Sequence, residues 1–241
     1  MSTVPSRHSS LPVLPIVGEA EPFTVGRIFC VGRNYAAHVR EMGKDPQREL
    51  PFFFMKPATA LVAVLDAHAS IPYPPKTGSF QHEIELVAAI GSRASAVSVV
   101  DALRHVFGYA VGLDMTRRDL QLAARDAGRP WEFGKSFAYS APVGPLRRAR
   151  DVGHPSAGEI WLKVNGATRQ QADISHLIWS VAESISYLST FDPLEPGDLL
   201  FTGTPAGVGD VVAGDTLHGA VAGIGEIHVR IGPPLSTGDV R

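Results

Sequence analysis

Two glutamates separated by one residue are the first feature of this sequence that could do chemistry. Glu83 and Glu85 lie in the segment His82-Glu83-Ile84-Glu85-Leu86. On a β-strand, residues i and i+2 face the same side with their Cα atoms roughly 6.5 Å apart, so the two carboxylates can converge. The apolar residues Leu86 to Ile90 that follow favour a strand covered on both faces. Carboxylates about 4 Å apart in such a strand repel by about 4 kcal/mol at an effective dielectric of 20, so they need a cation. A solvated strand face is the alternative for an isolated Glu-x-Glu pair.

A third carboxylate could complete a metal site. Asp114 ends another apolar segment, Tyr109 to Leu113, which the pattern predicts to be a strand. Three carboxylates with no cysteine or clustered histidine favour a hard ion that keeps waters. We therefore expect Mg²⁺ or Mn²⁺ at this site, in preference to a structural Zn²⁺.

A histidine and a glutamate lie three residues apart in a short predicted helix, Tyr35 to Met42. We expect Asn34 to cap this helix and Gly43 to end it. At spacing i and i+3, His38 and Glu41 share one helix face and can form a hydrogen bond. Such a pair can serve as a general base with its orienting partner, although an exposed surface pair has the same spacing.

Lys135 is a further candidate because it lies within the aromatic segment Trp131 to Phe137. A structural reading is that its aliphatic stem covers apolar surface while the ammonium reaches water. The glycine-rich segment 203–209 lacks the lysine of a phosphate-binding loop, and neither Ser140 nor Ser180 has the Gly-x-Ser-x-Gly setting of a serine hydrolase.

Composition excludes several classes of function. The chain has 241 residues, 44% of them hydrophobic, and a formal net charge of -2, so it offers no global attraction to nucleic acid or to an anionic membrane. No apolar run approaches the roughly 18 to 20 residues that a membrane span needs. The single cysteine, Cys30, cannot form an internal disulfide, which favours a cytoplasmic location.

The elements that must position these residues are predominantly short. The 24 glycines and 19 prolines predict many turns, short strands and few long helices. The pattern predicts one strand over 82–90, an irregular loop over 71–78, and a hairpin turning at Asn165-Gly166. It also predicts a helix opening at Thr116 and a longer one beginning at Ser175. We expect one domain, residues 23–241, preceded by an N-terminal arm, residues 1–22.

Taken together, these motifs resemble the fumarylacetoacetate hydrolase family over about residues 24 to 232, in the family's order. The segments that carry the resemblance are Gly32-Arg33-Asn34-Tyr35 with His38 and Glu41, Lys56-Pro57, His82 to Leu86, Gly108 to Asp114, Arg118-Asp119, Lys135 and Thr202 to Gly209. These ordered segments together are far more specific than any one of them.

The resemblance implies an α+β, β-rich fold, a mixed β-sandwich or roll of the family's C-terminal type with short helices, and a homodimer. It implies that Glu83, Glu85 and Asp114 bind Mg²⁺ or Mn²⁺ and that His38 with Glu41 activates water. The residues that it places at the substrate are Lys135, Arg33, Tyr35, Arg118, Gln121 and Thr204.

Other segments are similar to the branch of the family that hydrolyses fumarylpyruvate, a 3-acylpyruvate, in gentisate degradation. They are Pro51 to Phe54, Tyr73 to Pro75, Gly112 to Gln121 and Gly128 to Glu132. The implied reaction is cleavage of a carbon–carbon bond: His38 deprotonates water, hydroxide attacks the distal carbonyl, and pyruvate leaves as its enolate. Ala138, Tyr139 and Thr59 depart from the branch pattern, which affects the acyl specificity that we expect.

Two other functions remain open at this point. The same metal site could decarboxylate oxaloacetate or isomerise a dienoate, because these routes also pass through an enolate. A metal-binding scaffold without catalysis is the other alternative, and the His38-Glu41 pair together with Lys135 disfavours it because a scaffold requires neither.

Overall fold

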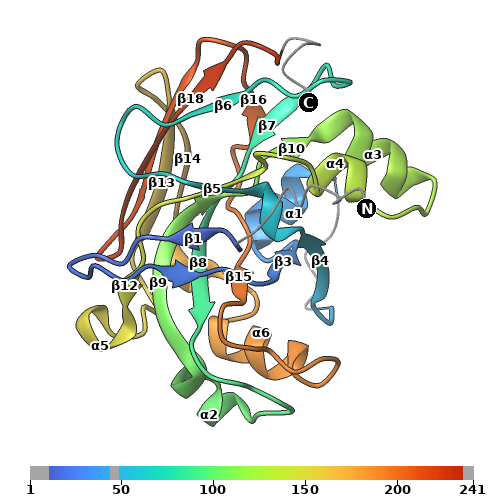
Figure 1. Ribbon diagram of the computed structural model, residues 1–241. Helices are drawn as coiled ribbons and strands as arrows, with labels where there is room; N and C mark the ends of the chain where they lie inside the picture. Colours follow the sequence, from blue (N-terminus) through green and yellow to red (C-terminus); the bar gives the residue numbers. More distant parts are fainter. Residues whose placement is uncertain (1–10, 44–48, 236–241) are drawn as a thin grey trace, which may run out of the picture.

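Strands dominate the architecture, which we describe from a computed structural model covering residues 11–43 and 49–235 (Figure 1). The largest sheet is mixed and follows the order β4-β3-β15-β8-β9-β11-β5, with β12 paired to β9. Its strands are β3 (Ile28–Gly32), β4 (Phe52–Lys56), β5 (Leu61–Ala63), β8 (Ile84–Ile90), β9 (Val106–Leu113), β11 (Ala141–Val143), β12 (Arg147–Arg148) and β15 (Leu199–Phe201).

A second sheet of five strands packs against the first, in the order β14-β13-β17-β18-β6. Its strands are β6 (Ser70–Pro72), β13 (Glu159–Val164), β14 (Ala167–Asp173), β17 (Thr216–Val221) and β18 (Gly225–Gly232). Two small sheets complete the strands: β1 (Val13–Leu14) with β2 (Phe23–Thr24), and β7 (Phe80–His82) between β10 (Thr116–Arg117) and β16 (Gly209–Asp210).

The helices are short and gather at two ends of the sheets. Figure 1 shows α3 and α4 together near one end, and α2 and α6 together near the other. The helices are α1 (Ala36–Glu41), α2 (Val99–Ala102), α3 (Arg118–Asp126), α4 (Glu132–Lys135), α5 (Ala149–Val152) and α6 (Val181–Leu188), with 3₁₀ turns at Ala58–Ala60, Leu103–His105 and Ile174–His176. Among the described residues, none of the helices has the length and apolar character needed to cross a membrane.

Strand β8 lies at the centre of the molecule and is buried along its whole length. Successive residues of this strand face opposite sides of the sheet. Leu86 and Ile90 join the large core between the two sheets, whereas Val87 packs into a smaller core that also contains Leu14 and Ile16 from the predicted N-terminal arm. The expected coverage of both strand faces and the expected β-rich α+β sandwich are therefore confirmed. Residues 1–10 of the predicted arm lie outside the described residues.

Four local predictions need correction. The strand expected over 82–90 is interrupted at Glu83, because β7 and β8 pair with different neighbours. The segment expected to be an irregular loop contains β6, an edge strand in which a proline is tolerated. Thr116 lies in β10 and does not cap α3. The helix expected from Ser175 begins later, at the capping box formed by Ser180 and Glu183.

Candidate metal and catalytic site

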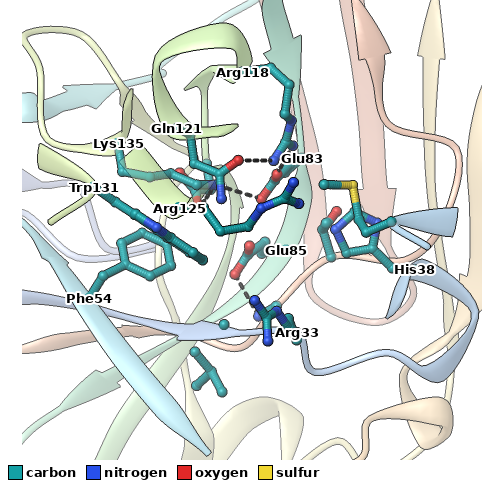
Figure 2. A pocket seen from close by; sticks show the side chains of 16 residues that line it. Arg33, His38, Phe54, Glu83, Glu85, Arg118, Gln121, Arg125, Trp131 and Lys135 are labelled. Carbon is teal, nitrogen blue, oxygen red and sulfur yellow. Dashed lines mark hydrogen bonds and ion pairs between the residues drawn. The ribbon is translucent and has the colours of Figure 1, made fainter. Parts of the chain in front are cut away.

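A buried pocket lies where the beginning of β8, the end of β9 and helices α1, α3 and α4 meet (Figure 2). The antiparallel pairing of β8 with β9 sets Glu85 opposite Gly112 and Ile84 opposite Leu113. The start of one strand thus adjoins the end of the other. This register carries Asp114 beside Glu83, whose carbonyl accepts the Asp114 backbone N–H at 2.8 Å.

The three carboxylates predicted as metal ligands meet in this pocket. Glu83, Glu85 and Asp114 are each no more than 5% exposed. Each offers an oxygen such that the three oxygens lie within 4.8 Å of one another. Glu83 lies between β7 and β8, Glu85 lies in β8, and Asp114 follows β9, the antiparallel neighbour of β8, so the three carboxylates come close together. The two glutamates do not share one continuous strand.

Three buried cations surround the carboxylates. Lys135 Nζ donates to Glu83 Oε2 at 2.8 Å and to Asp114 Oδ2 at 2.7 Å. Arg118 pairs with Glu83 through its Nη2. Lys56 Nζ lies 2.8 Å from Asp114 Oδ1. Burial raises the pKa of Glu83, but Lys135 and Arg118 outweigh that effect and hold the pKa well below its usual range. Burial likewise opposes the charge on Lys135, and the carboxylates of Asp114 and Glu83 still raise its pKa.

Glu85 has a different environment. Its carboxylate accepts the Gly203 backbone N–H at 2.6 Å, and burial together with the nearby Asp114 and Glu83 raises its pKa well above the usual value. A divalent cation would offset the negative charge that gathers locally at Glu85, so the residues present fit one. An all-oxygen set of three carboxylates suits Mg²⁺ or Mn²⁺.

His38 of the predicted histidine–glutamate pair faces the same pocket from α1 (Figure 2). His38 Nδ1 lies 3.0 Å from Glu41 Oε2, and the other oxygen of Glu41 accepts the Gly207 backbone N–H at 2.9 Å. Glu41 is therefore anchored to the glycine-rich segment 203–209 while it orients the imidazole. The pair is not a freely exposed surface contact, since His38 is only 7% exposed.

Comparison with known proteins agrees with this architecture and with this set of residues. The family model for the fumarylacetoacetate hydrolase C-terminal region matches residues 27–232. The chain belongs to the fumarylacetoacetate hydrolase family.

Three relatives indicate the range of this family. The crystal structure of fumarylpyruvate hydrolase from Pseudomonas aeruginosa, in complex with Mn²⁺ and pyruvate, is 54% identical with a TM-score of 0.93, covering 96% of this chain and 100% of that one. A fumarylpyruvate hydrolase from Ralstonia sp. is 47% identical over 78% of this chain and 96% of its own length. The human mitochondrial oxaloacetate tautomerase FAHD1 is 40% identical over 86% of this chain and 92% of its own length.

Five of the six residues that the family resemblance placed at the substrate line the pocket: Lys135, Arg33, Arg118, Gln121 and Thr204. Arg118 is held by Gln81 Oε1 at 2.7 Å as well as by Glu83. Gln121 Oε1 accepts from Arg118 Nη1 at 3.2 Å, so these two side chains of α3 hold each other in place. The Thr204 hydroxyl donates to the Ile84 carbonyl at 2.8 Å.

Tyr35 does not join them. Its side chain is 2% exposed and lies outside the pocket lining, and burial raises the pKa of its phenol. Asn34 was expected to cap α1, but its side chain instead donates to the carbonyls of Trp179 and Thr202, both at 2.8 Å. The adjacent Tyr35 takes the N-cap position without a side-chain hydrogen bond.

Several residues of the site were not predicted from the sequence. Lys56 received no role, although a lysine at the end of an aromatic strand resembles Lys135 in its surroundings. Phe54, Trp131 and Arg125 also line the pocket, and the rings of Phe54 and Trp131 pack with centroids 5.7 Å apart. The alternation of β4 could have indicated Phe54 and Lys56 together, because residues i and i+2 share a strand face.

Proposed function

We propose that this chain is a hydrolase of 3-acylpyruvates that depends on Mg²⁺ or Mn²⁺, and that it converts fumarylpyruvate to fumarate and pyruvate, the step used in cytoplasmic gentisate degradation. The observation that carries the proposal is the convergence on one pocket of three buried carboxylates, the Lys135 ammonium and His38, whose imidazole Glu41 holds. Relatives named for this reaction, one of them holding Mn²⁺ and pyruvate, support it.

In this proposal Glu83, Glu85 and Asp114 hold the metal. A bound divalent ion supplies a Lewis acid that stabilises negative charge on the substrate's oxygens. Glu41 holds Nδ1 of His38, which leaves Nε2 of the imidazole to accept a proton from water. Lys135 places a fixed positive charge where the departing pyruvate becomes negative, and such preorganised charge is a large contribution to catalysis.

The charge of the pocket favours a substrate with two carboxylates. The cations of Lys56, Lys135 and Arg118 balance the three carboxylates one for one, so a divalent ion would leave the site positive. Arg33 and Arg125 add two further guanidinium groups to the lining. Fumarylpyruvate carries a second carboxylate at the far end of its acyl group, whereas a simple acylpyruvate does not.

Release of pyruvate tests the proposal. The full chain is supplied with fumarylpyruvate, with an acylpyruvate that has an uncharged tail, and with oxaloacetate, each in Mg²⁺ and in a chelator. We expect metal-dependent release that is fastest from fumarylpyruvate. No release from any of the three substrates would contradict the proposal and favour the scaffold alternative.

Oxaloacetate is the second candidate substrate, because a 40% identical relative is named as an oxaloacetate tautomerase. Tautomerisation, like decarboxylation or dienoate isomerisation, needs no attack by water on a distal carbonyl. The His38 pair separates the two functions: the hydrolase requires it to activate water, whereas a reaction through the enolate alone requires mainly the metal site.

We also propose that residues 23–241 form the catalytic domain behind an arm of residues 1–22, and that the chain is a homodimer. Apolar side chains near the edge strand β4 support the dimer: Leu50 is 68% exposed, Met55 44% and Phe133 81%. Sedimentation of the full chain tests it, and a monomer at all concentrations would contradict it.

A further inference from the structure

Two histidines and a glutamate gather on the second sheet, on the side opposite the large core. His218 of β17 and His228 of β18 are direct partners across the two strands. Glu226 lies two residues before His228 and therefore on the same strand face. The residues next to them along the strands, Leu217, Ile227 and Val229, point the other way and are buried. No residue of β17 or β18 lines the catalytic pocket described above.

The side chains already converge on one point. His218 Nε2 lies 2.9 Å from Glu226 Oε2, and His228 Nε2 lies 3.5 Å from the same oxygen. The two imidazole rings are stacked with centroids 3.8 Å apart and an angle of 20° between their planes. Trp161 of the neighbouring strand β13 packs edge-on against His218, with centroids 4.8 Å apart, and limits how that ring can turn.

We propose that His218, Glu226 and His228 form a second metal site, one that selects a borderline transition ion such as Zn²⁺. Two imidazoles and one carboxylate are a common ligand set for Zn²⁺, with bonds of about 2.0 to 2.2 Å. In a tetrahedron with such bonds, the ligand atoms lie about 3.4 Å apart, and the two N···O distances here bracket that value. Side-chain exposures of 38%, 60% and 39% leave room for a water as the fourth ligand.

Binding requires modest local adjustment. The rings are nearly parallel, so they must tilt toward each other to aim both Nε2 lone pairs at one ion. The sheet can accommodate this change, because all three residues lie on the exposed face and their backbone is fixed by the β17–β18 ladder. The ion would connect the two strands of the hairpin at the face that the core does not hold.

The two metal sites differ in chemistry, and this difference allows them to be tested separately. Carboxylate oxygens suit Mg²⁺, whereas imidazole nitrogen suits Zn²⁺ and binds Mg²⁺ poorly. Saturating Mg²⁺ therefore occupies the pocket of Glu83, Glu85 and Asp114 and leaves the histidine cluster available.

The test is a calorimetric titration of the full chain with Zn²⁺ in saturating Mg²⁺. We expect one equivalent of Zn²⁺ to bind, with affinity reduced at least tenfold by His218→Ala and by His228→Ala. His68→Ala, which removes an exposed imidazole elsewhere, and Glu85→Gln, which alters the other site, should leave this equivalent in place. Circular dichroism establishes that each variant is folded.

Three outcomes would overturn the proposal. Zn²⁺ could fail to bind in saturating Mg²⁺, which would make the cluster a hydrogen-bonded surface group only. Binding could persist unchanged in both histidine variants, or it could be lost in Glu85→Gln instead, which would assign the Zn²⁺ to the catalytic pocket. Should one histidine variant fail to fold, the other, together with Glu226→Gln, still decides between these results.

Discussion

Glu85 is the carboxylate whose charge the neighbouring side chains balance least. Lys135 and Arg118 pair with Glu83, and Lys56 and Lys135 pair with Asp114, whereas Glu85 receives a backbone N–H from Gly203. Without a metal, the chain either bears the repulsion among three carboxylates or protonates one of them. The raised pKa of Glu85 is the direct sign of this conflict, and it makes the metal-free stability sensitive to pH.

We predict that metal-free stability falls as pH rises and that Glu85→Gln removes this loss. A carboxyl whose pKa is raised by folding contributes stability that is fully present below its unfolded value, near 4.5, and lost as pH rises through the folded value. The amide cannot ionise, so its unfolding free energy should vary less with pH above 4.5. Urea unfolding in a chelator from pH 5 to 8 measures this, and parallel curves for the two proteins would contradict it.

The same substitution should weaken metal binding, because the amide keeps the shape of the side chain but loses its charge. Glu83→Gln and Asp114→Asn should do likewise, and each should abolish activity while the fold survives. Calorimetry with Mn²⁺ measures the affinity. Unchanged affinity in all three variants would show that the carboxylates do not hold the ion.

His38 and Glu41 should affect hydrolysis without affecting metal affinity. We predict that His38→Ala lowers turnover by roughly 10² to 10⁴, the contribution typical of a general base. Glu41→Gln should lose less, because this residue only orients the imidazole from its anchor on Gly207. Turnover of both variants at saturating Mg²⁺ is the measurement, and near wild-type rates would exclude the pair from the mechanism.

Strand β4 contributes to the site through its last residue, Lys56. The side chain of Lys56 is fully buried, and Nζ contacts Asp114 as well as the Met115 carbonyl at 3.2 Å and Ser140 Oγ at 3.0 Å. One ammonium therefore connects the edge of the large sheet to the junction after β9. Because β4 is an edge strand, it depends on such contacts more than a central strand does.

We predict that Lys56→Met destabilises the metal-free chain by up to about 3 to 5 kcal/mol, the cost typical of breaking a buried ion pair, because Asp114 then keeps only Lys135 as a cationic partner. The double variant Lys56→Met/Asp114→Asn should recover part of this loss, because it also removes the carboxylate that has lost one of its two cationic partners. Lys76→Met, at an exposed loop position, serves as the control. Urea unfolding measures all three, and a Lys56→Met curve matching the control would refute the assigned role.

Local chemistry allowed some elements to be predicted and concealed others. The hairpin at Asn165-Gly166 is correct because its turn requires two residues with positive φ, and both have it. Capping residues were less informative. Asn34 and Thr116 have side chains typical of helix caps, but both form hydrogen bonds with residues distant in sequence instead. Asn34 donates to the Thr202 carbonyl, and the Thr116 hydroxyl accepts from Lys135 Nζ at 2.7 Å.

In the site, too, some residues could be predicted from the local sequence and others could not. Spacing indicated that Glu83, Glu85 and Asp114 could meet, since their positions at strand ends are encoded locally. The pairing of Lys56 with Asp114 depends on the order β4-β3-β15-β8-β9, which joins segments far apart in the chain. The hydrophobic periodicity of a sequence does not indicate the order of strands in a sheet. Family resemblance supplied the candidate substrate residues, and one of them, Tyr35, is a buried side chain outside the pocket lining.

Across the whole molecule, charge is distributed unevenly. The chain has a formal net charge of -2, yet its pocket brings Arg33 and Arg125 to a site whose other charges already balance. With a divalent ion bound, the pocket becomes a positive concavity in a slightly negative protein, which concentrates anionic substrates. Arg125 also contacts Asp126 at 2.8 Å, whereas among the residues that the structure describes no carboxylate pairs with Arg33.

Arg33 is therefore the residue that we expect to recognise the second carboxylate. Its backbone has a φ of +58°, unusual for a residue other than glycine, and its guanidinium lies 5.2 Å from the centre of the Phe52 ring. Hydrogen bonds to charged groups are worth about 1.5 to 3 kcal/mol, so Arg33→Met should raise KM for fumarylpyruvate by roughly 10- to 150-fold. An acylpyruvate with an uncharged tail should be affected little, because it offers nothing for the guanidinium to bind. Arg104→Met, at an exposed position, is the matched control. Steady-state kinetics on both substrates measure the effect. An equal rise in KM for both would mean that Arg33 supports the pocket without binding the second carboxylate of fumarylpyruvate.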